Sequence, residues 1–196
     1  MNDEPADPPP SAEAILAATK AIGFTMASEP KTGSLLRTLA ATKPAGQLLE
    51  LGTGTGYATA WLLDGMDAAS ALTTVESEAR FQGIAKKHLD EDDPRVHFVQ
   101  TDAADYLSGA ESSRFDLIFA DTWAGKFTHL NEAIALLKPG GLYVIDDMLP
   151  QPSWPEDHGK KVALALEELA ARADVLVTRL NWATGIILAV KTKSNS

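Results

Sequence analysis

Apolar and polar residues alternate along this chain in blocks that predict strands and helices in turn. Short apolar runs, typical of strands buried on both faces of a sheet, occur at residues 48–51, 71–75, 96–99, 115–120 and 142–145. Between them, apolar residues recur every three or four positions, which is the period of an amphipathic helix. The alternation predicts an α/β fold with a doubly wound, largely parallel sheet and helices on both faces.

The two ends of the pattern differ from its middle. Residues 1–10 are acidic and rich in proline, so we expect a disordered tail. A helix is predicted to begin after Ser11, a residue type that favours the N-cap position. Near the other end, residues 175–180 and 185–190 predict a closing pair of strands. We therefore expect a single domain over residues 11–196.

The middle of the chain is organised around the segment LLELGTGTGYATAWLL, residues 48–63. It predicts a buried strand, a turn that contains Gly52, Gly54 and Gly56, and a helix that opens at Tyr57. Alternate glycines let the backbone turn sharply and bring a ligand close to bare N–H groups. Those groups lie at a helix N-terminus, which favours a polar or anionic ligand. The arrangement predicts the start of a nucleotide-binding unit.

The residues around the turn indicate which nucleotide it binds. A dinucleotide fingerprint needs a small residue three positions after its second glycine, and Tyr57 is too large for that place. The pattern here begins with Glu50 and has the form acidic-x-Gly-x-Gly-x-Gly. It resembles the first motif of the class I S-adenosylmethionine-dependent methyltransferases.

A second block, LLKPGGLYVIDD at residues 136–147, resembles the Pro-Gly-Gly turn that precedes the fifth strand in those enzymes. The resemblance covers about residues 24–191, nearly the whole of the chain after the predicted tail. It implies a Rossmann-like seven-stranded sheet of order 3-2-1-4-5-7-6, with strand 7 antiparallel.

Several polar residues are candidates for binding the cofactor. Glu76 follows the second strand and can accept hydrogen bonds from both hydroxyls of a ribose, although Glu78 is a competitor. The resemblance implies that Asp102, or Asp105 as the alternative, contacts the adenine. It also implies that the loop with Met26 and Ser28 covers the cofactor. The alternative is that this segment is only a packing helix and loop. The full predicted set is Met26, Ser28, Glu50, Gly52, Thr53, Gly54, Gly56, Tyr57, Glu76, Ser77, Asp102, Ala103 and Asp121.

The resemblance to the catechol-type O-methyltransferases also implies a metal site. In that family an aspartate after the fourth strand and an Asp-Asn pair after the fifth bind magnesium or calcium. This chain has Asp121 and then Asp146-Asp147, with a carboxylate in place of the amide. Hard oxygen ligands suit Mg²⁺ or Ca²⁺. Three close carboxylates need a positive neighbour. A metal, Lys126 or a solvated, splayed Asp147 would each resolve that repulsion.

A catalytic base is predicted at Lys126. In the catechol-type family a lysine three residues after the aspartate takes this role, whereas here Lys126 follows Asp121 by five residues. A surface lysine is the alternative, and His129 and His158 are then the next candidates. The segment before His158, from residue 149, holds three prolines and is predicted to be a stiff loop at the substrate pocket.

The charge and composition of the chain limit the kinds of partner that we expect it to bind. A net charge of −10 argues against a nucleic-acid substrate, because phosphate backbones require a positive surface. No apolar run reaches the length of a membrane span, no signal peptide is visible, and cysteine is absent, which fits a cytoplasmic protein. We expect a small-molecule substrate, no membrane partner, and leave open a homodimer.

Together these features predict an S-adenosylmethionine-dependent methyltransferase that methylates an oxygen of a small hydroxylated molecule, phenolic or catechol-like. The protein must mainly align the acceptor with the methyl group and deprotonate it. Two alternatives stay open: a dinucleotide-binding oxidoreductase, disfavoured by Tyr57, and a non-catalytic cofactor-binding protein on the same fold.

Overall fold

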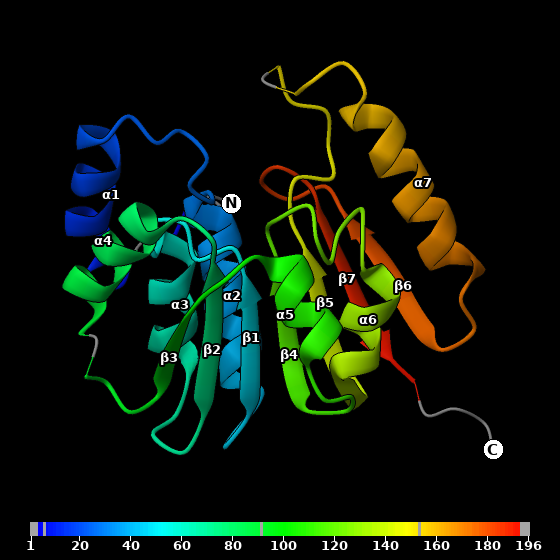
Figure 1. Ribbon diagram of the computed structural model, residues 1–196, viewed down its shortest axis with the longest axis horizontal. Coiled ribbons are helices and arrows are strands. Elements are labelled where there is room, and N and C mark those ends of the chain that lie inside the picture. Colours follow the sequence, from blue (N-terminus) through cyan, green and yellow to red (C-terminus); the bar gives the residue numbers. More distant parts are fainter. Residues whose placement is uncertain (1–3, 6, 91, 153, 193–196) are drawn as a thin grey trace.

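A mixed β-sheet with helices on both faces forms the molecule (Figure 1). The computed structural model describes residues 4–5, 7–90, 92–152 and 154–192. The described strands are β1 (Gln47–Leu51), β2 (Ala71–Glu76), β3 (Val96–Gln100), β4 (Phe115–Ala120), β5 (Leu137–Ile145), β6 (Val175–Leu180) and β7 (Ile186–Lys191). The described helices are α1 (Ala12–Ala21), α2 (Pro30–Ala41), α3 (Tyr57–Gly65), α4 (Ala79–Leu89), α5 (Ala103–Gly109), α6 (Leu130–Leu136) and α7 (His158–Ala171).

The sheet has the order β3-β2-β1-β4-β5-β7-β6, and β7 runs antiparallel to both β5 and β6. The fold class, the strand order and the antiparallel seventh strand predicted from the sequence are therefore confirmed. The first five strands are parallel, so their carboxyl ends meet at one edge of the sheet. In an open sheet of this kind ligands bind at that edge.

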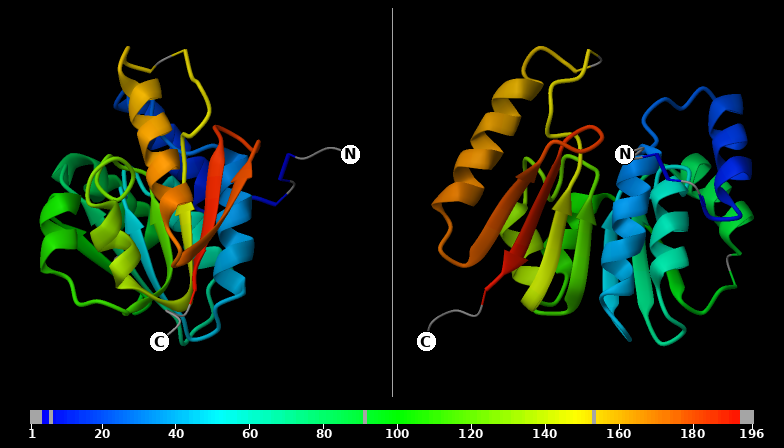
Figure 2. Two further views of the ribbon diagram at one scale, coloured as in Figure 1. Left: turned by 90° about the vertical axis from the view of Figure 1, so that its right-hand side faces the viewer. Right: turned by 180° about the vertical axis from the view of Figure 1, so that it is seen from behind.

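Helices cover both faces of the sheet (Figure 2), and one hydrophobic cluster lies on each face. Helices α1 to α4 pack on one face, where they meet side chains such as Leu48 of β1. Helices α5 to α7 pack on the other face, against Leu49 and Leu51. Because successive strand residues point to opposite faces, the unbroken apolar run of β1 serves both clusters at once.

Some predicted boundaries differ from the structure. Strand β5 begins at Leu137, five residues before the predicted start at Leu142, because Leu137 already pairs with Phe115 across a register shift. Ser11 stands at the N-cap of α1, but its side chain makes no capping hydrogen bond. The N–H of Ala12 is instead bonded to the carbonyl of Pro9, 2.9 Å away.

The predicted tail, residues 1–10, is described in part. The carboxylate of Asp7 pairs with Arg37 of α2 at 3.0 Å, and Pro9 is buried. These contacts concern described residues only, and the disorder expected of the tail stays a prediction. Residues 1–3 and 6 lie outside the described part of the chain. Within that part, no helix is both long and apolar enough to cross a membrane.

Candidate functional site

The glycine turn after β1 opens directly onto the carboxyl edge of the sheet. Gly52, Gly54 and Gly56 all have positive φ, at 103°, 50° and 93°. A Cβ on Gly52 would lie 2.7 Å from a methyl carbon of Thr122, and one on Gly56 would lie 2.7 Å from the Cβ of Ala85. Side chains are thus excluded at both ends of the turn by conformation and by space.

A cavity of about 140 Å³ lies beside this turn. Five of the predicted cofactor residues line it: Gly52, Glu76, Ser77, Asp102 and Ala103. Val75, Thr122, Trp123 and Ala124 line it as well and were missed in the sequence. The last three directly follow Asp121 at the end of β4, and that position was the one signal that could have found them.

Glu76 is fixed at the mouth of the cavity by backbone donors. Its Oε2 accepts a hydrogen bond from the N–H of Gly54 at 2.8 Å, and its Oε1 accepts one from the N–H of Glu78 at 3.0 Å. Asp102 is exposed, and its Oδ1 accepts a bond from the N–H of Ala104, which caps α5. Both carboxylates keep further lone pairs for a ligand.

The remaining predicted cofactor residues lie outside the lining of this cavity. Met26 is 73% exposed on the loop before α2. The other members are Ser28, Glu50, Thr53, Gly54, Gly56, Tyr57 and Asp121, and of these Glu50, Thr53, Gly56 and Tyr57 are buried. These residues support the turn or border the neighbouring acid group, and their part in binding stays a prediction.

Glu50 is fully buried beneath the turn. Its Oε2 accepts hydrogen bonds from the hydroxyls of Thr59 and Thr74, while its Oε1 has no partner within the described residues. Burial raises the pKa of Glu50 to about 7. The hydrogen bonds from the two threonines lower this pKa, and repulsion by Glu76 raises it. The strand therefore carries an acid that titrates near neutral pH.

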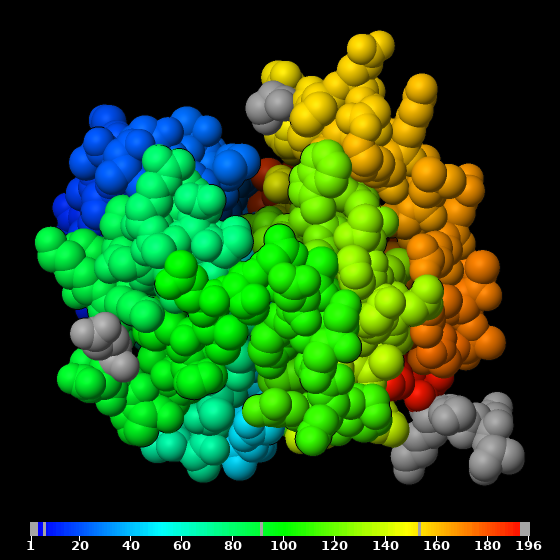
Figure 3. All heavy atoms as spheres, in the orientation of Figure 1, coloured from blue at the N-terminus to red at the C-terminus, as the bar shows by residue number. Residues whose placement is uncertain are grey.

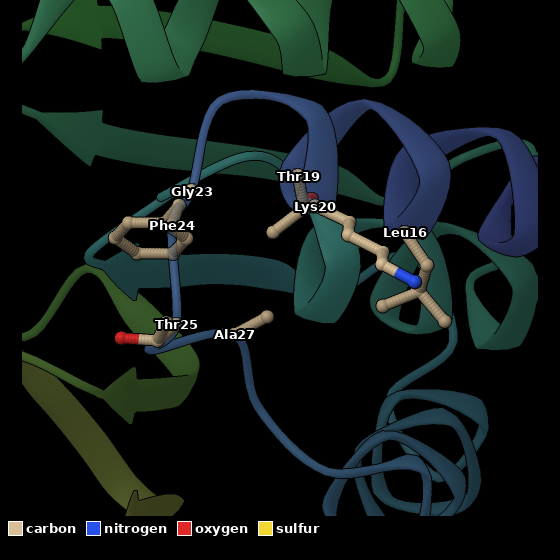
Figure 4. A pocket seen from close by; sticks show the side chains of 7 residues that line it. All are labelled: Leu16, Thr19, Lys20, Gly23, Phe24, Thr25 and Ala27. Atoms are coloured by element: carbon tan, nitrogen blue, oxygen red, sulfur yellow. The ribbon is translucent and has the colours of Figure 1, made fainter.

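A second hollow, of about 270 Å³, lies between α1 and the loop that follows it (Figure 4). Its lining is Leu16, Thr19, Lys20, Gly23, Phe24, Thr25 and Ala27. None of these residues was predicted to bind the cofactor. The ring of Phe24 separates this hollow from the glycine turn, since a Cβ on Gly54 would lie 3.5 Å from that ring.

The loop after β4 carries Lys126 into the interior. Gly125 has φ of 89°, and a Cβ there would lie 2.7 Å from Leu51, so the loop packs closely on the sheet. The hydroxyl of Tyr143 donates a hydrogen bond to the carbonyl of Gly125 from below. Lys126 is only 4% exposed. The predicted alternative of a surface lysine is therefore wrong.

Asp121 and Asp146 directly follow β4 and β5 at the carboxyl edge of the sheet. Asp121 Oδ2 accepts a hydrogen bond from the Ser28 hydroxyl at 3.0 Å. Asp146 Oδ1 accepts bonds from the Thr184 hydroxyl and from the N–H of Asp147. Burial raises the pKa of both acids. Repulsion by Asp146 raises that of Asp121 further, and the Lys126 charge opposes both shifts.

The predicted metal ligands do not form a ligand set. Asp147 has φ of 58° and is half-buried, which sets it apart from its buried neighbour Asp146. Within the described residues, no group of three His, Cys, Asp or Glu side chains is arranged to hold a metal ion. The hydroxyls of Ser28 and Thr184 bond to one carboxylate oxygen of Asp121 and one of Asp146. The residues present therefore do not fit Mg²⁺ or Ca²⁺.

Aromatic rings surround His158 at the start of α7. Its ring lies 4.2 Å from that of Trp154 and 5.0 Å from that of Phe127, measured between centroids, and Trp123 lies 6.3 Å away. Neither ring nitrogen has a partner within the described residues. Burial lowers the pKa of His158, and the charge of Lys126 lowers it further. The proline-containing segment before His158 thus brings Trp154 into contact with the His158 ring.

Trp123 lies between the two parts of the site, because it lines the cavity beside the glycine turn and also contacts the ring of Phe127. Figure 3 shows a notch in the surface between the blue N-terminal segments and the yellow segment before α7. A glycine turn after β1, an acid at the end of β2, another after β3, and a sheet of this order define the class I methyltransferase fold.

The chain belongs to the methyltransferase domain family, whose model matches residues 49–148. It is 33% identical over 142 residues to a protein of Mycolicibacterium vanbaalenii named "Putative O-methyltransferase", an alignment that covers 69% of this chain and 63% of that protein. The chain thus spans less than two thirds of the length of this curated relative.

Solved structures have the same fold. The O-methyltransferase TomG from Streptomyces achromogenes, in complex with SAM, matches with a TM-score of 0.82 and 25% identity, over 95% of this chain and 91% of that one. The O-methyltransferase from Bacillus cereus, in complex with SAH, matches with a TM-score of 0.82 and 23% identity, over 96% and 92% of the two chains. The second likeness concerns the fold alone.

Proposed function

We propose that this protein is an S-adenosylmethionine-dependent O-methyltransferase that acts on a small hydroxylated molecule. The observation that carries the proposal is the cavity beside the glycine turn. Glu76, Asp102 and Gly52, which has no side chain, all line this cavity at the carboxyl edge of the sheet. Two carboxylates spaced along that edge suit the ribose and the adenine of the cofactor. The SAM found in TomG supports the same ligand here.

The acceptor would enter on the other side of Trp123. There the rings of Phe127, Trp154 and His158 form an apolar wall, and Lys126 and His158 bring polar atoms without partners in the described chain. Aromatic walls with a few polar groups suit a planar acceptor with a hydroxyl group. The sulfonium of the cofactor supplies the electrophilic methyl group, so the protein mainly has to orient and deprotonate that hydroxyl.

Two side chains can accept the hydroxyl proton. Lys126 is the base predicted from the sequence, and His158 is a second candidate because its lowered pKa keeps the imidazole neutral near pH 7. A homodimer stays a prediction, and no feature of the described chain bears on it.

Calorimetry with S-adenosylhomocysteine and with NAD tests the cofactor. We expect binding of the first and none of the second, while the reverse result would replace the proposal with an oxidoreductase. Incubation of the protein with S-adenosylmethionine and a panel of phenols and catechols, followed by mass spectrometry, tests the transfer. Cofactor binding without any methylated product across the panel would favour the non-catalytic alternative.

A further inference from the structure

Helix α1 is bonded directly to the glycine turn. The hydroxyl of Thr19 in α1 and that of Thr55 in the turn are 2.7 Å apart, and both side chains are buried. Thr19 also donates a hydrogen bond to the carbonyl of Ile15, at 2.7 Å. Because a hydroxyl carries one proton, Thr55 is the donor in the pair. The bond therefore joins the turn to a helix residue that lies 36 positions earlier in the sequence.

The loop after α1 contacts the same turn one residue earlier. The ring of Phe24 packs on that of Phe81 in α4, with their centroids 4.5 Å apart. A Cβ on Gly54 would lie 3.5 Å from the Phe24 ring, so this ring covers the backbone of Gly54. Figure 4 shows Thr19 on α1 and Phe24 on the loop that follows it. One segment of the chain thus supports two successive residues of the turn.

A turn built on glycines needs such contacts to stay in one conformation. Gly52, Gly54 and Gly56 all have positive φ, and glycine has more alternative conformations open to it than any other residue. A ligand binds only those molecules whose turn has the binding conformation, and its apparent affinity falls with their fraction. A hydrogen bond that holds the turn can therefore strengthen binding without touching the ligand.

We propose that Thr19 is a positioning residue for the cofactor, because its bond to Thr55 holds the glycine turn in the conformation that binds. Thr19 is not among the described residues that line the cavity beside the turn, so it acts through the turn. The identity of the ligand rests on the proposed function.

Calorimetric titration of the folded protein with S-adenosylhomocysteine tests this role. Thr19→Val keeps the shape of the side chain and removes its hydroxyl, so it should weaken binding about three- to tenfold, as expected for one lost hydrogen bond. Thr19→Ser keeps the hydroxyl and should bind like the wild type. A purely structural role would lower the unfolding temperature of Thr19→Val and leave its affinity unchanged.

Thr38→Val is the matched control. Thr38 is an exposed residue of α2, and its hydroxyl also donates to a carbonyl four residues earlier, that of Ser34 at 3.0 Å. Its replacement removes a helix hydrogen bond of the same kind and should leave the affinity unchanged. Thr55→Val removes the other partner of the proposed bond. Because both changes remove one bond, the double variant Thr19→Val, Thr55→Val should bind no more weakly than either single variant.

Two results would overturn the proposal. One is wild-type affinity in a folded Thr19→Val protein, and the other is a double variant in which the two single losses add. If Thr19→Val does not fold, Thr55→Val decides in its place, because an unchanged affinity refutes the proposal and a loss of the expected size supports it.

A wild-type protein that does not bind S-adenosylhomocysteine would refute the proposed function. Amide hydrogen exchange in the cofactor-free protein then tests the hold on the turn by itself. Exchange at residues 52–56 should be faster in Thr19→Val than in the wild type and in Thr38→Val. Equal rates in all three proteins would show that Thr19 does not hold the turn.

Discussion

Burial of Glu50 should make the stability of the cofactor-free protein fall as the pH rises toward neutrality. The folded state raises the pKa of this acid from its ordinary value of 4.5 to about 7. Below pH 4.5 the folded and unfolded chains are both protonated at Glu50, so this group does not change the free energy of unfolding with pH. Between the two values the folded chain holds a proton that the unfolded chain has lost, so raising the pH favours unfolding.

The size of the effect follows from the two pKa values. Each tenfold change in proton affinity corresponds to about 1.4 kcal/mol, so Glu50 should lower the free energy of unfolding by about 3 kcal/mol between pH 4 and pH 8. Glu50→Gln cannot ionise and lacks this contribution. The difference in unfolding free energy between the wild type and Glu50→Gln should therefore decline by that amount across the range.

Urea unfolding followed by tryptophan fluorescence, at a series of pH values, measures this difference, since the chain has four tryptophans. The other acids occur in both proteins, so their contributions to the pH dependence of the unfolding free energy largely cancel in this difference. Thr74→Val is the matched variant, because it removes a hydrogen bond that favours the ionised form and should steepen the decline. A difference between wild type and Glu50→Gln that stays constant with pH would show that Glu50 is not desolvated as argued.

Three further outcomes are expected. Gly52→Ala should abolish S-adenosylhomocysteine binding in calorimetry, because its Cβ would meet Thr122 at 2.7 Å in a backbone with φ of 103°; binding at wild-type affinity would contradict the assigned cavity. Glu76→Ala should weaken that binding by about 1–3 kcal/mol through lost charged hydrogen bonds, whereas an unchanged affinity would exclude Glu76 as a ribose ligand. Tyr143→Phe leaves the buried carbonyl of Gly125 without its donor and should lower the free energy of unfolding by about 1–3 kcal/mol, measured in urea; an unchanged value would show that this hydrogen bond does not stabilise the loop.

The sequence predicted the parts of this molecule that depend on local patterns. The apolar runs of β1 and β4 placed both strands at the centre of the sheet, and the residues after them, Gly52 and Asp121, had to lie at its carboxyl edge. Glu76 lines the cavity for the same reason. Position at a strand end was enough to place these groups, because parallel strands share that edge.

Contacts between distant segments could not be predicted in this way. Ser28 and Asp121 are 93 residues apart, and Thr184 and Asp146 are 38 apart, with no periodicity that relates them. The burial of Lys126 depends on how Gly125 packs on Leu51 and Tyr143, which no spacing from Asp121 reveals. Within the described residues no group of three His, Cys, Asp or Glu side chains is arranged for a metal ion, which depends equally on tertiary structure.

The turn between β6 and β7 has a consequence for the order in which the protein is made. The indole N–H of Trp182 donates to the carbonyl of Lys31, 151 residues away, and Thr184 bonds to Asp146. On the ribosome, the glycine turn and its strand can form long before residues 182–184 emerge. The cofactor half of the site can therefore assemble early, while the acid group waits for nearly the whole described chain. A nascent chain that stalls before Trp182 should lack the contacts to Lys31 and Asp146, since closing so long a loop comes late in folding.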